Sequence, residues 1–122
     1  MSWKLSSDRP IYAQIIEELQ LRIVSGEYRA GQRMPSVREL AAQAEVNPNT
    51  MQKALAEMEQ SGLLYSQRTS GRFVTEDQEM IENVKETLAK EEIKAFVENM
   101  RQLGFNNEEI VMQVQNIVKE EQ

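Results

Sequence analysis

The stretch that decides the fold, Met34–Thr75, reads MPSVRELAAQAEVNPNTMQKALAEMEQSGLLYSQRTSGRFVT. Ser36 followed by Glu39 is the pattern of a capping box, in which the two residues satisfy each other's backbone N–H groups at the start of a helix. Asn47 followed by Pro48 indicates a second helix start, because asparagine is a good N-cap and proline is favoured at the first helical position. The stretch therefore predicts two short helices separated by a short turn.

A small hairpin follows the second of these helices. Gly62 is a helix stop, because glycine readily adopts the left-handed conformation that ends a helix. The apolar, β-prone runs Leu63–Tyr65 and Phe73–Val74 enclose the polar, glycine-containing segment Ser66–Arg72, which predicts two strands joined by a turn. Two closely spaced helices followed by such a hairpin are the parts of a winged helix-turn-helix, which places one helix in the major groove of DNA.

Amphipathic helices are predicted on both sides of this stretch. Before it, apolar residues repeat every four positions over Ile11–Ile23, between a proline suited to a helix start and the helix stop Gly26. After it, a glutamate-rich segment carries apolar residues at helical spacing up to Gly104, and Asn106 or Asn107 caps a last helix. The predicted fold is therefore mainly α with a small β-hairpin.

Charge divides the chain into two parts. The net charge is −6, but residues 1–75 hold 9 Lys and Arg against 8 Asp and Glu, whereas residues 76–122 hold 5 against 12. Parts with such different charge indicate different tasks. We predict a winged helix-turn-helix DNA-binding domain over residues 1–75 and a two-helix C-terminal dimerisation tail over residues 76–122. Because the first part has so small a net charge, DNA binding must depend on where its cations lie.

The composition excludes several classes of function. The chain has no Cys and no His, which removes cysteine nucleophiles, histidine acid–base chemistry and the usual zinc ligands. The carboxylates form no recognisable catalytic arrangement and no glycine-rich phosphate loop is present, so we expect no enzyme, no cofactor and no metal site. Without a run of about 18 apolar residues or an apolar signal core at the N-terminus, we expect a cytoplasmic protein.

The helix that Asn47 opens is the predicted recognition helix. Its inward face is fixed by methionine and leucine side chains, so that Asn49 and Lys53 point the opposite way, with Gln52 on the flank. Asparagine and glutamine can make two hydrogen bonds to adenine, and lysine can reach guanine or phosphate. Thr50 and the N–H groups of the helix N-terminus can bind phosphate. Three arginines are further candidates, one for phosphate or a base edge and two at the hairpin tip for the DNA backbone or minor groove: Arg38, Arg68 and Arg72.

Each of these patterns also has a purely structural interpretation. Asn47 alone makes a good helix start, and Arg68 and Arg72 can simply keep a hairpin soluble. Arg38 can be half of a surface pair with the glutamate beside it. The tyrosine, phenylalanine and methionine side chains fit a core better than a ligand site, while Trp3 fits either packing on the first helix or a free anchor.

In this order and spacing, the segments resemble the winged helix-turn-helix of the GntR family of bacterial transcription regulators. Each piece alone is a weak signal, and the specificity of the match comes from the whole set. The Asn-Pro-Asn-Thr turn and the short tail look most like the YtrA-like subfamily, since other branches carry much larger effector-binding domains. The resemblance covers residues 3–74 and is carried by Pro10–Ile15, Gly31, Met34–Ala41, Val46–Ala54, Gly62–Leu64 and Gly71–Val74.

The resemblance implies specific residues for operator contact. Family members use the matching arginine of the second helix, the start of the recognition helix and the glycine-containing wing tip. Many members carry Arg where Pro48 and Gln52 stand here, and Thr is common where Arg72 stands, which leaves the operator sequence open but not the fold. The implied contacts carry over to Arg38, Asn49, Thr50, Gln52, Lys53 and Gly71.

The tail predicts self-association. Residues 76–122 are too few for an independent core, and two apolar helix faces need a cover. A two-fold dimer would present two recognition helices to the half-sites of a pseudo-palindromic operator, and the resemblance also implies a homodimer. A monomer with a helical lid is the alternative.

We therefore expect a sequence-specific transcription regulator, a repressor, that binds double-stranded operator DNA as a homodimer. The alternative is a winged-helix protein-interaction module without DNA binding, which the small net charge of residues 1–75 favours. No residue identifies a small-molecule effector, and a tail this short leaves little room for a pocket of the usual ~300 Å³ or more. The sequence leaves open whether a ligand binds at the dimer interface or between the tail and the DNA-binding domain.

Overall fold

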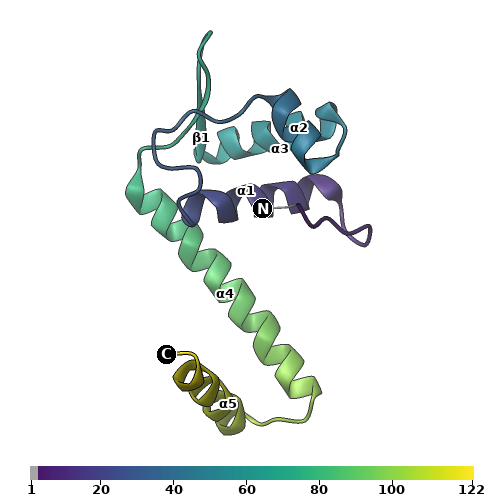
Figure 1. The fold of residues 1–122 in the computed structure, drawn as a ribbon, viewed down its shortest axis with the longest axis vertical. Helices are drawn as coiled ribbons and strands as arrows, with labels where there is room; N and C mark the ends of the chain where they lie inside the picture. Colours follow the sequence, from purple (N-terminus) through teal and green to yellow (C-terminus); the bar gives the residue numbers. More distant parts are fainter. Residues whose placement is uncertain (1–2) are drawn as a thin grey trace. The chain divides into compact units, whose positions relative to one another are not determined.

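Within residues 3–122, the part of the chain that the computed structural model describes, five helices and one two-stranded hairpin are present (Figure 1). Predictions that involve Met1 and Ser2 lie outside the described residues. The elements confirm the predicted class, mainly α with a small β-hairpin. In chain order they are α1 (Ile11–Val24), α2 (Val37–Ala44), α3 (Pro48–Ser61), β1 (Leu64–Gln67), β2 (Gly71–Val74), α4 (Gln78–Gln102) and α5 (Asn107–Glu120).

The helices start and stop where the local signals predict. Ser36 Oγ accepts a hydrogen bond from the Glu39 N–H at 3.1 Å, and the Ser36 N–H donates to the Glu39 carboxylate at 3.2 Å, which completes the capping box of α2. Asn47 Oδ1 accepts from the Asn49 N–H at 2.7 Å and caps α3. Gly62 ends α3 with a φ of 90°, a conformation that favours glycine. Of the two candidate caps of α5, Asn106 is the one used.

The first three helices and the hairpin enclose one core. Helix α3 packs against α1, α2 and β1, so it is held from three sides (Figure 1). The buried faces of these helices are the apolar faces that their periodicity predicts. The largest fully buried side chains are Ile15, Leu19, Leu40, Met51, Leu55, Met58, Leu63, Leu64 and Val74.

The hairpin is extended by a short piece of the loop between α1 and α2. Strands β1 and β2 are antiparallel, with Leu64 opposite Val74 and Gln67 opposite Gly71. Arg33 forms a bridge with Phe73, and the N–H after it donates to the Arg72 carbonyl at 2.8 Å. This third segment ties the base of the hairpin to the helical core and so fixes where the hairpin starts.

The N-terminal lead is fastened to α1. The buried amide of Gln14 donates to the Ser6 and Arg9 carbonyls at 2.8 and 3.0 Å and accepts from the Ser6 N–H at 2.8 Å. Trp3 packs against the core, and the Arg22 guanidinium lies 4.5 Å from the centre of its ring. Of the two roles open for Trp3, packing is the one adopted.

The chain forms two compact units with a boundary between Lys85 and Glu86, inside α4. The change in composition after Thr75 comes earlier than this boundary. The reason is that the first turns of α4 still pack on the core of the first unit through Met80 and Val84. No helix within the described residues is both long and apolar enough to cross a membrane.

Candidate nucleic-acid interface

Helix α3 divides its side chains between the core and the surface. The inward face predicted from the sequence is confirmed, since Met51, Ala54, Leu55 and Met58 are all buried. About 100° of rotation per residue then turns other positions away from the core. The exposed side chains in the first half of α3 include three of the predicted base-reading residues: Asn49, Gln52 and Lys53.

Lys53 is held by a residue of α1. Its ammonium lies 4.0 Å from the centre of the Tyr12 ring, which is a cation–π contact. Tyr12 is half-buried, so its ring serves as a support at the surface and not only as core. The sequence pattern assigned Tyr12 to the core, because periodicity shows that a residue lies near the inward face but not which side chain of another helix covers it.

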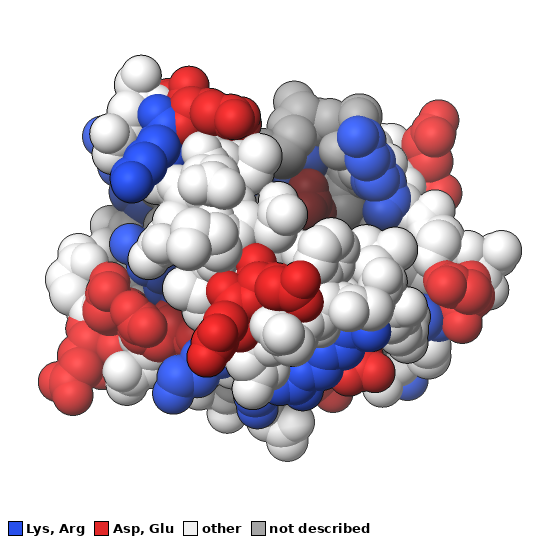
Figure 2. All heavy atoms as spheres, turned by 90° about the horizontal axis from the view of Figure 1, so that it is seen from below, with Lys and Arg blue, Asp and Glu red and all other residues white. Residues whose placement is uncertain are grey.

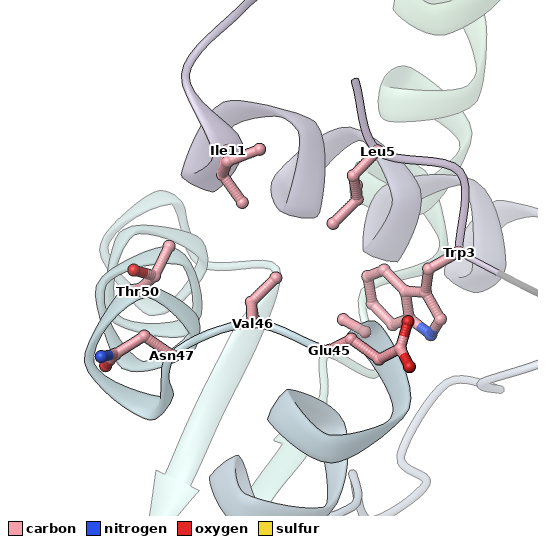
Figure 3. A pocket seen from close by; sticks show the side chains of 8 residues that line it. Trp3, Leu5, Ile11, Glu45, Val46, Asn47 and Thr50 are labelled. Atoms are coloured by element: carbon pink, nitrogen blue, oxygen red, sulfur yellow. The ribbon is translucent and has the colours of Figure 1, made fainter. Parts of the chain in front are cut away.

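The N-terminus of α3 borders a hollow of about 420 Å³ (Figure 3). Asn47 and Thr50, from the cap and first turn of α3, lie on one side of it, and Leu5 and Trp3 lie on the other. The Asn47 oxygen is used for capping, so the amide nitrogen is what the side chain retains for other contacts. Thr50 is half-buried, while Asn47 is exposed.

Arg38 and Arg68 carry exposed charges on α2 and on the hairpin turn. Arg68 opens the turn with a φ of 23°, and the Ser70 N–H closes it on the Gln67 carbonyl at 2.7 Å. The surface pair considered for Arg38 and Glu39 is absent from the ion pairs of residues 3–122, because the Glu39 carboxylate serves the capping box instead.

Gly71 is favoured by its backbone conformation and lies close to Arg33. It begins β2 with a φ of 104°, and a Cβ atom built there would lie 3.3 Å from Arg33 Nε. The Arg33 guanidinium therefore lies beside the start of β2 in the wing, which is the name we use for the hairpin Leu64–Val74. Sequence reasoning missed Arg33, because it lies in a loop with no helical or alternating pattern and meets the wing only through tertiary pairing.

Arg72 does not flank the tip of the wing but lies within β2, opposite Ser66. Its Nε donates to the Glu59 carboxylate of α3, and one terminal nitrogen donates to Gln52 Oε1 at 3.4 Å. Ser66 Oγ donates to the same Glu59 carboxylate at 2.8 Å. The hydrogen bonds from Arg72 and Ser66, together with the arginine charge, hold the pKa of Glu59 below its ordinary value. Two wing residues are thereby bonded to α3.

In the first compact unit, some cations are paired with carboxylates and others are not. Arg9, Arg22 and Arg72 are paired with carboxylates, whereas no ion pair within residues 3–122 involves Arg33, Arg38, Lys53 or Arg68. Arg38 lies on α2, Lys53 on α3, and Arg68 and Arg33 on the wing and its bridging segment, while three further cations of this unit that form no ion pair among the described residues lie outside these elements: Lys4, Arg29 and Lys85. Figure 2 shows a face of the molecule on which basic and acidic side chains are interspersed. Unpaired cations are therefore present on each of the elements predicted to read DNA, although they are not confined to them.

The second compact unit leaves an apolar surface open. The end of α4 and α5 line a hollow of about 310 Å³ through Phe96, Met100, Val114, Ile117 and Val118, together with one glutamine. Only Ile110 of α5 is buried. Further exposed apolar side chains of this unit are Ile93, Leu103, Val111 and Met112.

Comparison with known proteins identifies relatives of this arrangement. A sequence model described as "Bacterial regulatory proteins, gntR family" matches residues 11–74. The HTH-type transcriptional regulator YhcF of Bacillus subtilis (strain 168) is 39% identical over 111 residues, covering 91% of this chain and 92% of YhcF. The HTH-type transcriptional repressor YtrA of the same organism is 34% identical over 106 residues, covering 85% of this chain and 81% of YtrA, which agrees with the predicted subfamily.

Solved structures agree with the sequence relatives. A GntR family transcriptional regulator from Listeria monocytogenes superposes with a TM-score of 0.83 at 40% identity, covering 92% of this chain and 98% of that one. The DNA-binding domain of AraR in complex with operator ORR3 superposes with a TM-score of 0.51 at 34% identity, covering 62% of this chain and 93% of that one. The winged helix-turn-helix predicted from the sequence is thus a fold found on operator DNA.

Proposed function

The chain belongs to the GntR family of bacterial regulatory proteins, which are DNA-binding transcription regulators and not enzymes, and we propose that it acts as a homodimeric repressor of a pseudo-palindromic operator. In this proposal α3 lies in the major groove and the wing lies along the adjoining backbone. Repression follows from occupancy, because a bound dimer blocks access of polymerase to the promoter. We propose repression rather than activation because the relative YtrA is named a repressor.

The proposal for DNA contact is carried by one observation, the exposed polar face of α3 beside unpaired cations. Asn49, Gln52 and Lys53 would reach base edges, while the cap residue Asn47 and Thr50 would meet phosphate at the helix N-terminus. The remaining proposed contacts lie on α2, on the wing and on its bridging segment. They are Arg38, Arg68, Gly71 and, added from the structure, Arg33, while Arg72 lies beside them bonded to Glu59 and Gln52 of α3.

The proposal for dimerisation is supported by the apolar surface of α4 and α5. Side chains such as Phe96 and Ile117 are exposed, although helices of this composition need a cover for their apolar faces. A second copy offers the same surface, so a two-fold contact would bury both at once. The dimer would carry two copies of α3, as a pseudo-palindromic operator requires. No effector is needed for this arrangement.

The experiment that tests the function is selection of bound duplexes from a random library at two salt concentrations. We expect a two-fold-related sequence, bound less tightly as salt rises, because phosphate contacts release counterions. The double substitution Arg38→Ala and Lys53→Ala should lower operator affinity and reduce the slope of log affinity against log salt by about 1 for each of the two side chains that contacts phosphate. Enrichment of no sequence at low salt, or a double variant that binds unchanged, would contradict the proposal.

A further inference from the structure

The contact between the wing and α3 involves Arg72, a residue that differs from the one most common at this position in the family. Arg72 stands where threonine is common in the family, and in this chain it joins Glu59 and Gln52 of α3. Glu59 and Gln52 are two helical turns apart on one side of α3, so a single guanidinium can reach both. We call these three residues, Glu59, Arg72 and Gln52, the wing clasp.

The clasp determines how the Gln52 amide is turned. Arginine has five N–H donors and no acceptor, so the amide atom that faces Arg72 has to be the oxygen. The contact is 3.4 Å, at the long end for a hydrogen bond, and the charge on the donor favours it. The amide nitrogen, with its two N–H groups, is left for other partners.

This orientation matters for reading a base. A free glutamine recognises adenine by using both ends of its amide, with the oxygen accepting from N6 and the nitrogen donating to N7. When the oxygen is already engaged by an arginine, donation from the nitrogen is the stronger remaining interaction. Guanine offers two neighbouring acceptors, N7 and O6, to a donor in the major groove, whereas adenine offers one acceptor beside a donor.

We propose that Glu59 and Arg72 are positioning residues that turn Gln52 from an adenine-reading into a guanine-reading side chain. The inference rests on the proposed function and deepens it, because it names the base preference of one α3 position. Glu59 is necessary because its carboxylate holds Arg72 against α3; without it the guanidinium would be free to move to a phosphate. Arg72 then acts through Gln52 rather than as an independent contact.

The arrangement also explains a carboxylate on a DNA-reading helix. A negative charge near phosphates weakens DNA binding, so simple electrostatics predicts that removing Glu59 or Glu57 from α3 raises affinity for every sequence alike. The clasp predicts a different effect for Glu59 alone, since only its removal releases Arg72. Glu57 is exposed on the same helix and forms no ion pair within residues 3–122, which makes Glu57→Gln a matched control.

The test compares selected sequences for the unaltered chain and four variants. Gln52→Ala identifies the operator position that Gln52 reads, because the base preference there disappears. At that position we expect guanine in the unaltered chain, and a loss of about tenfold in guanine-over-adenine preference in Glu59→Gln and in Arg72→Lys, the scale of one base-specific pair. Lysine keeps the charge of Arg72 but has no fork of donors to span both partners. Glu57→Gln should retain the preference.

Two results separate failure of the inference from failure of the function. If the unaltered chain selects no sequence, the proposed function itself fails. If it selects a sequence, but Glu59→Gln and Arg72→Lys keep its preference at the Gln52 position, or that preference is for adenine, the clasp is overturned. Thermal unfolding checks each variant, and Arg72→Lys answers the question where Glu59→Gln does not fold. Combining Glu59→Gln with Gln52→Ala should give the same preferences as Gln52→Ala alone.

Discussion

Single side chains on the proposed DNA face are held by neighbours from other elements. Lys53 lies over Tyr12 of α1, and Arg72 of the wing is paired with Glu59 of α3. Long side chains lose conformational freedom when they bind, and those already held by a neighbour lose less of it. At the residue scale, the interface is therefore partly ordered before DNA arrives.

The pairing of Glu59 predicts a pH-dependent stability. Its pKa is lowered in the folded chain, first by the hydrogen bond from Arg72, so its contribution is present above the unfolded-state pKa of about 4.3 and is lost as the pH falls through the folded-state pKa. We expect the unfolding temperatures of the unaltered chain and Glu59→Gln to differ most at neutral pH and to converge in acid. Differential scanning calorimetry from pH 7 to about pH 3 measures this.

Glu57→Gln is the control for the calorimetry, since Glu57 has no ion pair among the described residues. A difference between the unaltered chain and Glu59→Gln that stays constant through the acid range would show that the ion pair contributes nothing to stability.

At the scale of elements, the N-terminus of α3 combines a structural and a proposed binding role. The Asn47 oxygen caps the helix, and the aligned peptide dipoles of α3 give that end a partial positive charge. Substitutions can distinguish the capping role from the proposed phosphate-binding role. A cap needs only an acceptor oxygen, whereas a phosphate contact is weakened by an added negative charge.

Two substitutions at Asn47 should separate these roles. Asn47→Ala removes the cap and should destabilise the fold by about 1 kcal/mol. Asn47→Asp keeps an acceptor at the cap and should leave stability nearly unchanged, while its charge should weaken operator binding about tenfold if phosphate lies there. Chemical denaturation and a DNA-binding titration measure the two effects. Equal operator affinity for Asn47→Asp and the unaltered chain would place phosphate away from this helix end.

At the scale of the whole molecule, the two compact units leave different surfaces to solvent. The first exposes polar and cationic side chains around α3, and the second exposes apolar side chains on α4 and α5. Apolar surface drives association because burying it removes it from water. The assembly proposed above therefore depends on the second unit, and DNA contact depends on the first.

A charge placed in the apolar hollow of the second unit should break the dimer. Ile117 is 51% exposed, so Ile117→Glu should leave the monomer folded while placing a carboxylate in the proposed interface. We expect sedimentation near twice 14.1 kDa for the unaltered chain and near 14.1 kDa for this variant, which should also bind the operator more weakly. Gln115→Glu, an exposed α5 substitution that lies outside the hollow, is the control. An unaltered chain of 14.1 kDa at micromolar concentration would contradict the dimer.

The sequence by itself determined the elements of this protein and the inward face of α3. Helix caps, glycine stops and apolar spacing act between residues a few positions apart, so Ser36, Asn47 and Gly62 could be interpreted without knowing the rest of the fold. The match to the GntR family follows from the same local signals in a fixed order.

Only the tertiary structure decided which side chains work together. Tyr12 with Lys53, Arg33 with Gly71 and Arg72 with Glu59 are far apart along the chain. Such pairs depend on how α1, α3 and the wing pack, and no local pattern records that packing. For this reason Arg72 could be predicted as a free wing cation from its position in the sequence, although in the folded chain its charge is bound to α3.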